Sequence, residues 1–184
     1  MALAVGTVAC AGATTTEAAR PADSGGSCRP AELQALFRGF QVAGDSLAGA
    51  LVVVDAGSRP CRLDGSPRSV RLLDDDGDAV TARERALDLP VNGGPVDLAP
   101  GAPLPTFGAP PVHGSAWAAV TWSNWCSDAS PAIRSVLLVL PGGGSVVAPL
   151  DPALPDWAIG PPTPQCADRR AGSSLSFGRF QPAA

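Results

Sequence analysis

The chain has 184 residues, a formal net charge of −4 and only 16% charged residues, against about 25% in typical soluble proteins. All its cationic side chains are arginines, and Arg169 and Arg170 form the densest group, which argues against a nucleic-acid partner because such binding needs clustered cations. No apolar run reaches the length of about 18 residues that a membrane-spanning helix requires.

The N-terminal segment has the character of an export signal. Residues 1–9 are apolar, and the small residues before Cys10 resemble a bacterial lipobox, in which the cysteine becomes lipidated. We therefore expect residues 1–10 to be a signal segment and Cys10 to anchor the protein to the outer face of the cytoplasmic membrane. The alternative is an ordinary signal cleaved within residues 11–13, an A-x-A-like site, which would remove Cys10 and secrete the protein.

Residues 11–27 are small and polar and have no apolar face to bury. We expect a flexible tether with an end-to-end distance of roughly 20–25 Å. The domain is then expected to cover residues 28–182.

The first half of the domain predicts strands broken by turns. Residues 30–40 fit either a helical stripe or one face of a strand, and we favour the strand. Residues 47–54 are apolar on both sides, which is typical of a central strand. Residues 69–72 alternate as in a half-buried strand. The Asp-Gly pair within residues 74–78 predicts a hairpin turn, with a return strand over residues 79–82.

The second half continues the same pattern, and no internal repeat or alternation of helices with strands is visible. Further strands are predicted at residues 86–89, 96–98, 115–122, 133–140, 145–148 and 174–180. With 21 Gly and 20 Pro residues between short apolar runs, the sequence predicts an all-β fold: an antiparallel immunoglobulin-like β-sandwich of seven to nine short strands.

Four cysteines are spread over the domain and allow three disulfide pairings. We favour Cys28–Cys61 and Cys126–Cys166, because neighbours in sequence suit a meander of local hairpins. A metal site is the alternative, but there is no C-x-x-C spacing and His113 is the sole histidine. We expect two disulfides, no metal and no cofactor.

Several of these residues match an ordered pattern. They are the C-x-L-x-G-x-P element at residues 61–67, the cysteine after the leader (Cys28), residues 98–101 (LAPG), the Trp/Asn/Cys cluster at residues 122–126, and the late Cys166. Over residues 28–180 the chain resembles the family of actinobacterial exported proteins called domain of unknown function 4232. The resemblance implies an immunoglobulin-like sandwich, often on a lipoprotein tether. It implies no established activity, so no catalytic residue is transferred.

Candidate catalytic and metal-binding groups lack supporting context. A hydrolase would need His113 as the base for a nucleophile such as Ser115 or Ser123, but no G-x-S-x-G motif is present. Residues 74–78 lack the Gly and Glu of a calcium loop. Glu32 and Glu84 have no context that suits glycoside hydrolysis.

The tryptophans are the most promising contact residues. Trp117 and Trp122 are five positions apart, so on one strand they face opposite sides; one is expected in the core. Exposed Trp117, Trp125 or Trp157 would mark a carbohydrate- or peptide-binding face, whereas packing beneath Pro-rich loops is the alternative.

These observations lead to one main hypothesis and two alternatives. We expect a non-catalytic, lipid-anchored module of the cell envelope that binds an unknown envelope protein or glycan or plays a structural part there. The alternatives are a carbohydrate- or peptide-binding module using surface Trp, and an envelope hydrolase using His113.

Overall fold

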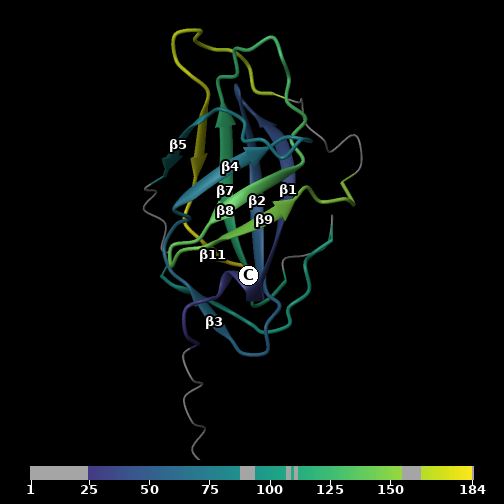
Figure 1. Ribbon diagram of the computed structural model, residues 1–184, viewed down its shortest axis with the longest axis vertical. Helices are drawn as coiled ribbons and strands as arrows, with labels where there is room; N and C mark the ends of the chain where they lie inside the picture. Colours follow the sequence, from purple (N-terminus) through teal and green to yellow (C-terminus); the bar gives the residue numbers. More distant parts are fainter. Residues whose placement is uncertain (1–24, 88–93, 107–108, 110–111, 155–162, 184) are drawn as a thin grey trace, which may run out of the picture.

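The computed structural model describes residues 25–87, 94–106, 109, 112–154 and 163–183 (Figure 1). These residues form one short 3-10 helix and eleven strands, and none of their helices is long and apolar enough to cross a membrane. The elements are η1 (Pro30–Glu32), β1 (Leu33–Ala43), β2 (Ser46–Asp55), β3 (Cys61–Leu63), β4 (Ser69–Leu73), β5 (Arg83–Ala86), β6 (Val96–Leu98), β7 (Ala116–Ser123), β8 (Ser135–Val139), β9 (Ser145–Pro149), β10 (Ser174–Phe177) and β11 (Gln181–Pro182).

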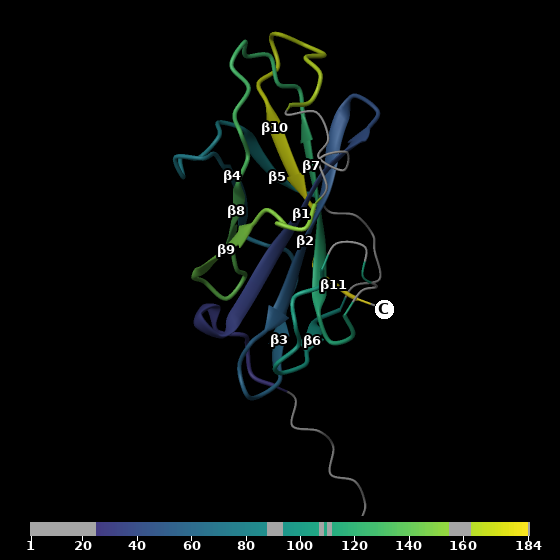
Figure 2. The same ribbon diagram turned by 90° about the vertical axis from the view of Figure 1, so that its right-hand side faces the viewer.

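The strands form the predicted all-β sandwich. The large sheet has the order β1-β2-β7-β10-β5, with β11 also paired to β7, and it packs against the sheet β4-β8-β9. Figure 2 shows these two layers side by side, with the small β3-β6 sheet at the end from which the N-terminal segment leaves. The core between the layers includes Phe37, Leu51, Leu72, Trp122 and Leu138.

Strand β7 is the centre of the large sheet, and its sequence alternates as a two-faced strand requires. Ala116, Ala118, Val120 and Trp122 are buried, while the residues between them are half-buried. The prediction that Trp117 and Trp122 face opposite sides is therefore confirmed, with Trp122 in the core.

The first two strands also agree with the sequence. Residues 30–40 are mainly strand, because η1 ends at Glu32 and β1 follows. A register shift between Phe37 and Phe40 surrounds Gly39, whose φ of 76° suits glycine. This bulge lets both phenylalanines enter the core, where their ring centroids lie 4.8 Å apart. β2 is a central strand, as predicted, between β1 and β7.

The predicted return strand over residues 79–82 is wrong. After the turn, a single bridge joins Leu73 to Ala79, and the chain then crosses to the large sheet. The predicted turn at residues 74–78 is present. The Asp74 N–H donates to the Asp78 carbonyl (3.1 Å), and Asp74 Oδ1 accepts the N–H groups of Asp76 (3.1 Å) and Asp78 (2.8 Å).

Strand β5 forms where the chain arrives. It pairs parallel to β10, so the sandwich is not purely antiparallel as predicted. The strand also lies at residues 83–86 rather than at the predicted residues 86–89. Residues 88 and 89 lie outside the described residues. The Glu84 carboxylate accepts hydrogen bonds from the Ser69 hydroxyl, the Val70 N–H and Arg71 Nε, which ties β5 to β4 in the facing sheet.

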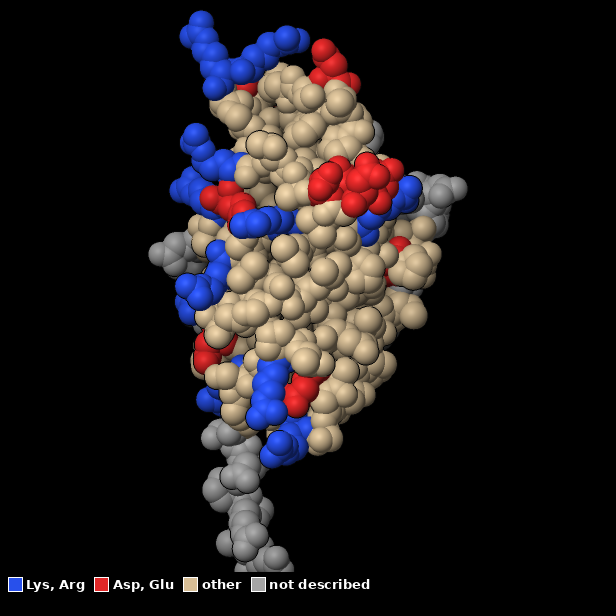
Figure 3. All heavy atoms as spheres, in the orientation of Figure 1, with Lys and Arg blue, Asp and Glu red and all other residues tan. Residues whose placement is uncertain are grey.

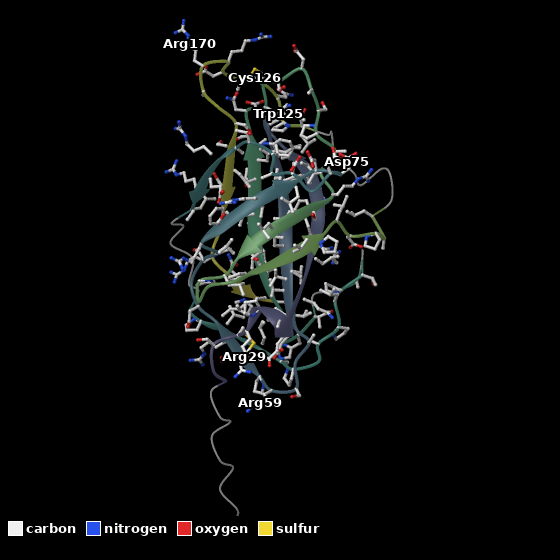
Figure 4. The ribbon with its side chains drawn as sticks, in the orientation of Figure 1. Arg29, Arg59, Asp75, Trp125, Cys126 and Arg170 are labelled. Carbon is white, nitrogen blue, oxygen red and sulfur yellow. A yellow bond between two sulfur atoms is a disulfide. The ribbon has the colours of Figure 1, made fainter. Side chains whose placement is uncertain are left out.

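The two disulfides have the expected connectivity, Cys28–Cys61 and Cys126–Cys166. The first joins the start of the domain to β3, where Gly26 and Ser27 are already paired with Arg62. The second closes the opposite end of the domain, where Figure 4 labels Cys126. The predicted disulfide pairing is confirmed. The reason given for it is wrong, because the strands do not form a meander of local hairpins.

The small β3-β6 sheet carries an exposed ion pair. Arg62 donates from Nε to Asp97 Oδ1 (2.7 Å) and from Nη2 to Asp97 Oδ2 (3.0 Å), across directly paired positions. This hydrogen-bonded guanidinium lowers the pKa of the Asp97 carboxyl. Because both groups are in solvent, the pair stabilises the domain little.

Candidate functional site

The main candidate site is an apolar pocket of about 350 Å³ on the outer face of the large sheet. Its floor is formed by adjacent strands, because Val52 of β2 is paired directly with Trp117 of β7. Three described residues between β6 and β7, Pro105, Ala109 and Val112, line its side. The lining residues are Arg38, Ala50, Val52, Pro105, Ala109, Val112, Ser115, Trp117 and Ala183.

The polar side chains of this pocket are Arg38 and Ser115, and both have partners within the domain. Arg38 Nε lies 3.5 Å from Asp151 Oδ2, and Asp151 is buried, with only 3% of its surface exposed. The Ser115 hydroxyl donates to the Val112 carbonyl at 2.6 Å. What the pocket offers a ligand is therefore chiefly aliphatic surface and the Trp117 indole.

The indole groups of the described tryptophans differ in their hydrogen bonds. Trp122 Nε1 donates to Ser173 Oγ and Trp125 Nε1 donates to the Ala129 carbonyl, each at 2.8 Å. Trp117 Nε1 makes no hydrogen bond to any residue that the structure describes. Trp117 can thus provide both an aromatic surface and a donor to a ligand.

The other predicted contact residues do not join Trp117. Trp125 is half-buried and packs against Trp122, with ring centroids 5.4 Å apart. It lies with Cys126 at the end of the domain remote from the N-terminal segment (Figure 4). Trp157 and Cys10 lie outside the described residues.

His113 is exposed in the loop before β7. It lines a second depression of about 370 Å³ with Pro60 and Asp97. Within the described part of the chain, no hydrogen bond joins its ring to a serine or an aspartate. Ser115 bonds to the Val112 carbonyl, and the Ser123 hydroxyl bonds to the Ser174 hydroxyl at 2.8 Å. The arrangement that the hydrolase hypothesis requires is not assembled from these residues.

The acidic candidates have structural explanations. Glu84 holds β4, and Glu32 forms a 3.8 Å ion pair with exposed Arg29. The carboxylates of Asp74, Asp75 and Asp76 lie within 4.8 Å of one another. Asp74 uses one oxygen within its own turn, and Asp75 and Asp76 are exposed, so these residues form a solvated loop.

The sequence identified Trp117 but not the rest of the pocket. Arg38, Ala50 and Val52 belong to strands whose side-by-side order depends on non-local pairing. A partial signal was present, since Arg38 interrupts an apolar run that otherwise enters the core.

Fold and site together define a disulfide-stabilised β-sandwich with an apolar pocket on one sheet. The family model called Domain of unknown function (DUF4232) matches residues 28–106, and this confirms the resemblance over that segment. The matched range includes Cys28, Cys61 and the pocket residues of β1 and β2, whereas Trp117 lies beyond its C-terminal limit. No curated protein and no solved structure matches the chain.

Proposed function

We propose that this protein is a non-catalytic binding module of the cell envelope, held at the membrane by a lipid on Cys10, and that its pocket receives an apolar side chain of a peptide or protein partner. The observation that carries the binding role is the concave apolar site built around Trp117. Ligand sites are typically apolar concavities with a small number of polar groups.

The lining favours a peptide over a glycan. Sugar binding combines an aromatic surface with several side-chain hydrogen-bonding groups that face the sugar hydroxyls, since a buried hydroxyl without a partner is costly. In this pocket the polar side chains are Arg38 and Ser115, and both already interact with the domain. A glycan remains the second candidate because Trp117 offers a stacking surface.

The two disulfides support an extracytoplasmic setting, because disulfides persist in oxidising compartments. The lipobox-like sequence before Cys10 supports the anchor. The small polar residues 11–27 suit a spacer between that anchor and the domain.

The pocket predicts a specific nuclear magnetic resonance result. The indole N–H signal of Trp117 is assigned by its loss in Trp117→Phe, and short peptides with a single Leu, Phe or Pro are then titrated. We expect an apolar peptide to shift this signal, and Ala50→Leu, which fills the pocket, to weaken that peptide's binding at least about tenfold.

The matched control is Val147→Ala, which changes an apolar side chain that is 52% exposed on β9 of the other sheet. It should leave peptide affinity unchanged. If chitooligosaccharides rather than peptides shift the Trp117 signal, the glycan candidate replaces the peptide one. If neither ligand class shifts it, the pocket is not the binding site.

The anchor is tested separately by intact mass spectrometry of the protein from a native-like host. We expect a species that begins at Cys10 and carries a diacylglyceryl group, with the mass of four hydrogen atoms gained on reduction of the two disulfides. Cys10→Ser should abolish the lipid mass and release the protein from membranes. A wild-type protein without lipid would contradict the anchor and leave the pocket proposal standing.

A further inference from the structure

A second surface occupies the same face of the large sheet, beyond the pocket. The strand registers place outward-facing residues of β2, β7, β10 and β5 in two rows, the outer-face rows. One row is Ser46, Ser123, Ser174 and Arg83, and the next is Ala48, Thr121, Ser176 and Arg85. Each arginine therefore ends a row whose neighbouring positions carry hydroxyl groups.

The outward direction of both arginines follows from their neighbours. In β5, Glu84 and Ala86 are paired with Leu175 and Phe177, which are buried against the facing sheet. Alternation along the strand turns the intervening positions, Arg83 and Arg85, to the other face.

Arg83 and Arg85 are exposed and are not held by carboxylates. Neither forms an ion pair with any residue that the structure describes, whereas Arg71 is paired with Glu84 at 3.1 Å. Figure 3 shows arginine side chains along the border of the molecule on the β5 side. Figure 4 places Asp75, in the acidic loop, near the opposite border.

Arginines outnumber acidic side chains along the β5 border in this view (Figure 3), although the chain as a whole has a net charge of −4. Screening limits the influence of the remote acidic loop, because the Debye length at physiological salt is about 8 Å. Glu84 lies between the two arginines in the sequence, but its carboxylate faces the other sheet and is bound there by Ser69, Val70 and Arg71. The outer face of β5 therefore carries the two guanidinium groups.

We propose that the outer-face rows bind a linear phosphate-bearing polymer of the cell envelope. Residues two apart on a strand are separated by roughly 7 Å, so the two guanidinium groups can contact two anionic groups of one chain at the same time. Arginine binds phosphate through two parallel N–H groups. The neighbouring Ser176 hydroxyl can donate to the same chain, and the Ser174 hydroxyl can do so when it accepts from the Ser123 hydroxyl.

The position of the arginines favours a polymer over the membrane surface. Strand β5 lies in the half of the domain remote from the point where the N-terminal segment leaves (Figure 1). This preference rests on the proposed anchor, because a lipid on Cys10 would hold the end of the domain that contains Cys28 nearest to the lipid headgroups. The surface also differs from the Trp117 pocket, so the two proposals fail independently.

The test measures binding of long-chain inorganic polyphosphate to the full domain by fluorescence anisotropy at two salt concentrations. We expect R83Q/R85Q to bind at least about tenfold more weakly than the wild type and to show a shallower dependence on salt, because fewer counterions are released. The control R29Q/R59Q removes two exposed arginines at the tether end (Figure 4) and should bind as the wild type does.

Equal melting temperatures of the two double variants show that both are folded. Equal losses of polyphosphate affinity in both variants would overturn the proposal, since binding would then follow net charge alone. It is also overturned if polyphosphate does not bind, or if vesicles of phosphatidylglycerol bind through Arg83 and Arg85 more tightly than polyphosphate does. Unchanged pocket binding in R83Q/R85Q separates this result from the Trp117 proposal.

Discussion

Replacing Trp122 with alanine is expected to lower the free energy of unfolding by about 3–5 kcal/mol. Trp122 is fully buried, and its ring centroid lies 5.8 Å from that of Phe40 and 5.4 Å from that of Trp125. Its removal leaves a cavity that the surrounding strands cannot close, and it also leaves the Ser173 hydroxyl without its indole partner. Denaturant unfolding with both disulfides intact measures the loss.

The matched control for Trp122→Ala lies on the same strand. Trp117→Ala removes an equal side chain from the outer face, where the indole is only half-buried, so its cost should be less than half as large. Equal losses in the two variants would contradict the assignment of the inner face of β7. Both variants remove the same type of side chain from one strand, so their losses in the free energy of unfolding can be compared directly.

Removing the Cys28–Cys61 disulfide, by replacing both residues with alanine, is expected to lower the free energy of unfolding by about 4 kcal/mol. The bond closes a loop with a sequence separation of 33, and closing such a loop chiefly restricts the unfolded chain. Alanine avoids placing a hydroxyl at Cys61, which is buried. Denaturant unfolding of the wild type and the double variant gives the difference.

The second disulfide is the natural comparison, because its sequence separation of 40 predicts a similar loss, also about 4 kcal/mol. Its loop is additionally held by Asn124, whose amide donates to the Asp168 carbonyl and accepts the Asp168 N–H, each at 2.8 Å. The folded loop should therefore persist without the Cys126–Cys166 bond. Rapid hydrogen exchange at Asp168 in that double variant would show that the disulfide, rather than Asn124, holds the loop.

What the sequence predicts well is local or depends on alternation. The apolar pattern of residues 115–122 identifies β7 and the opposite faces of its two tryptophans. What it misses depends on contacts between distant segments. The acidic turn at residues 74–78 predicts a hairpin with a return strand, yet the next strand, β5, pairs with β10 of the large sheet. Glu84 of β5 links it back to β4 by accepting hydrogen bonds from Ser69 and Arg71.

The candidate site was predictable to the same limited extent. Trp117 could be singled out because an aromatic residue on the outer face of a strand needs an explanation. Ala50 and Val52 could not, since their role follows from the pairing of β2 with β7, which are about sixty residues apart in the chain. Arg83 and Arg85 acquire their hydroxyl neighbours only through the parallel register with β10.

The central place of β7 bears on how the domain can assemble. β7 pairs with β2, which precedes it, and with β10 and β11, which follow it. The family-matched residues 28–106 end before β7, and they also lack β8, which pairs with β4. Such non-local pairing slows folding, because the chain loses the entropy of closing long loops before the stabilising contacts between distant strands can form. We therefore expect residues 28–106 not to form either of the two facing sheets on their own, because β2 and β4 would lack their partners β7 and β8.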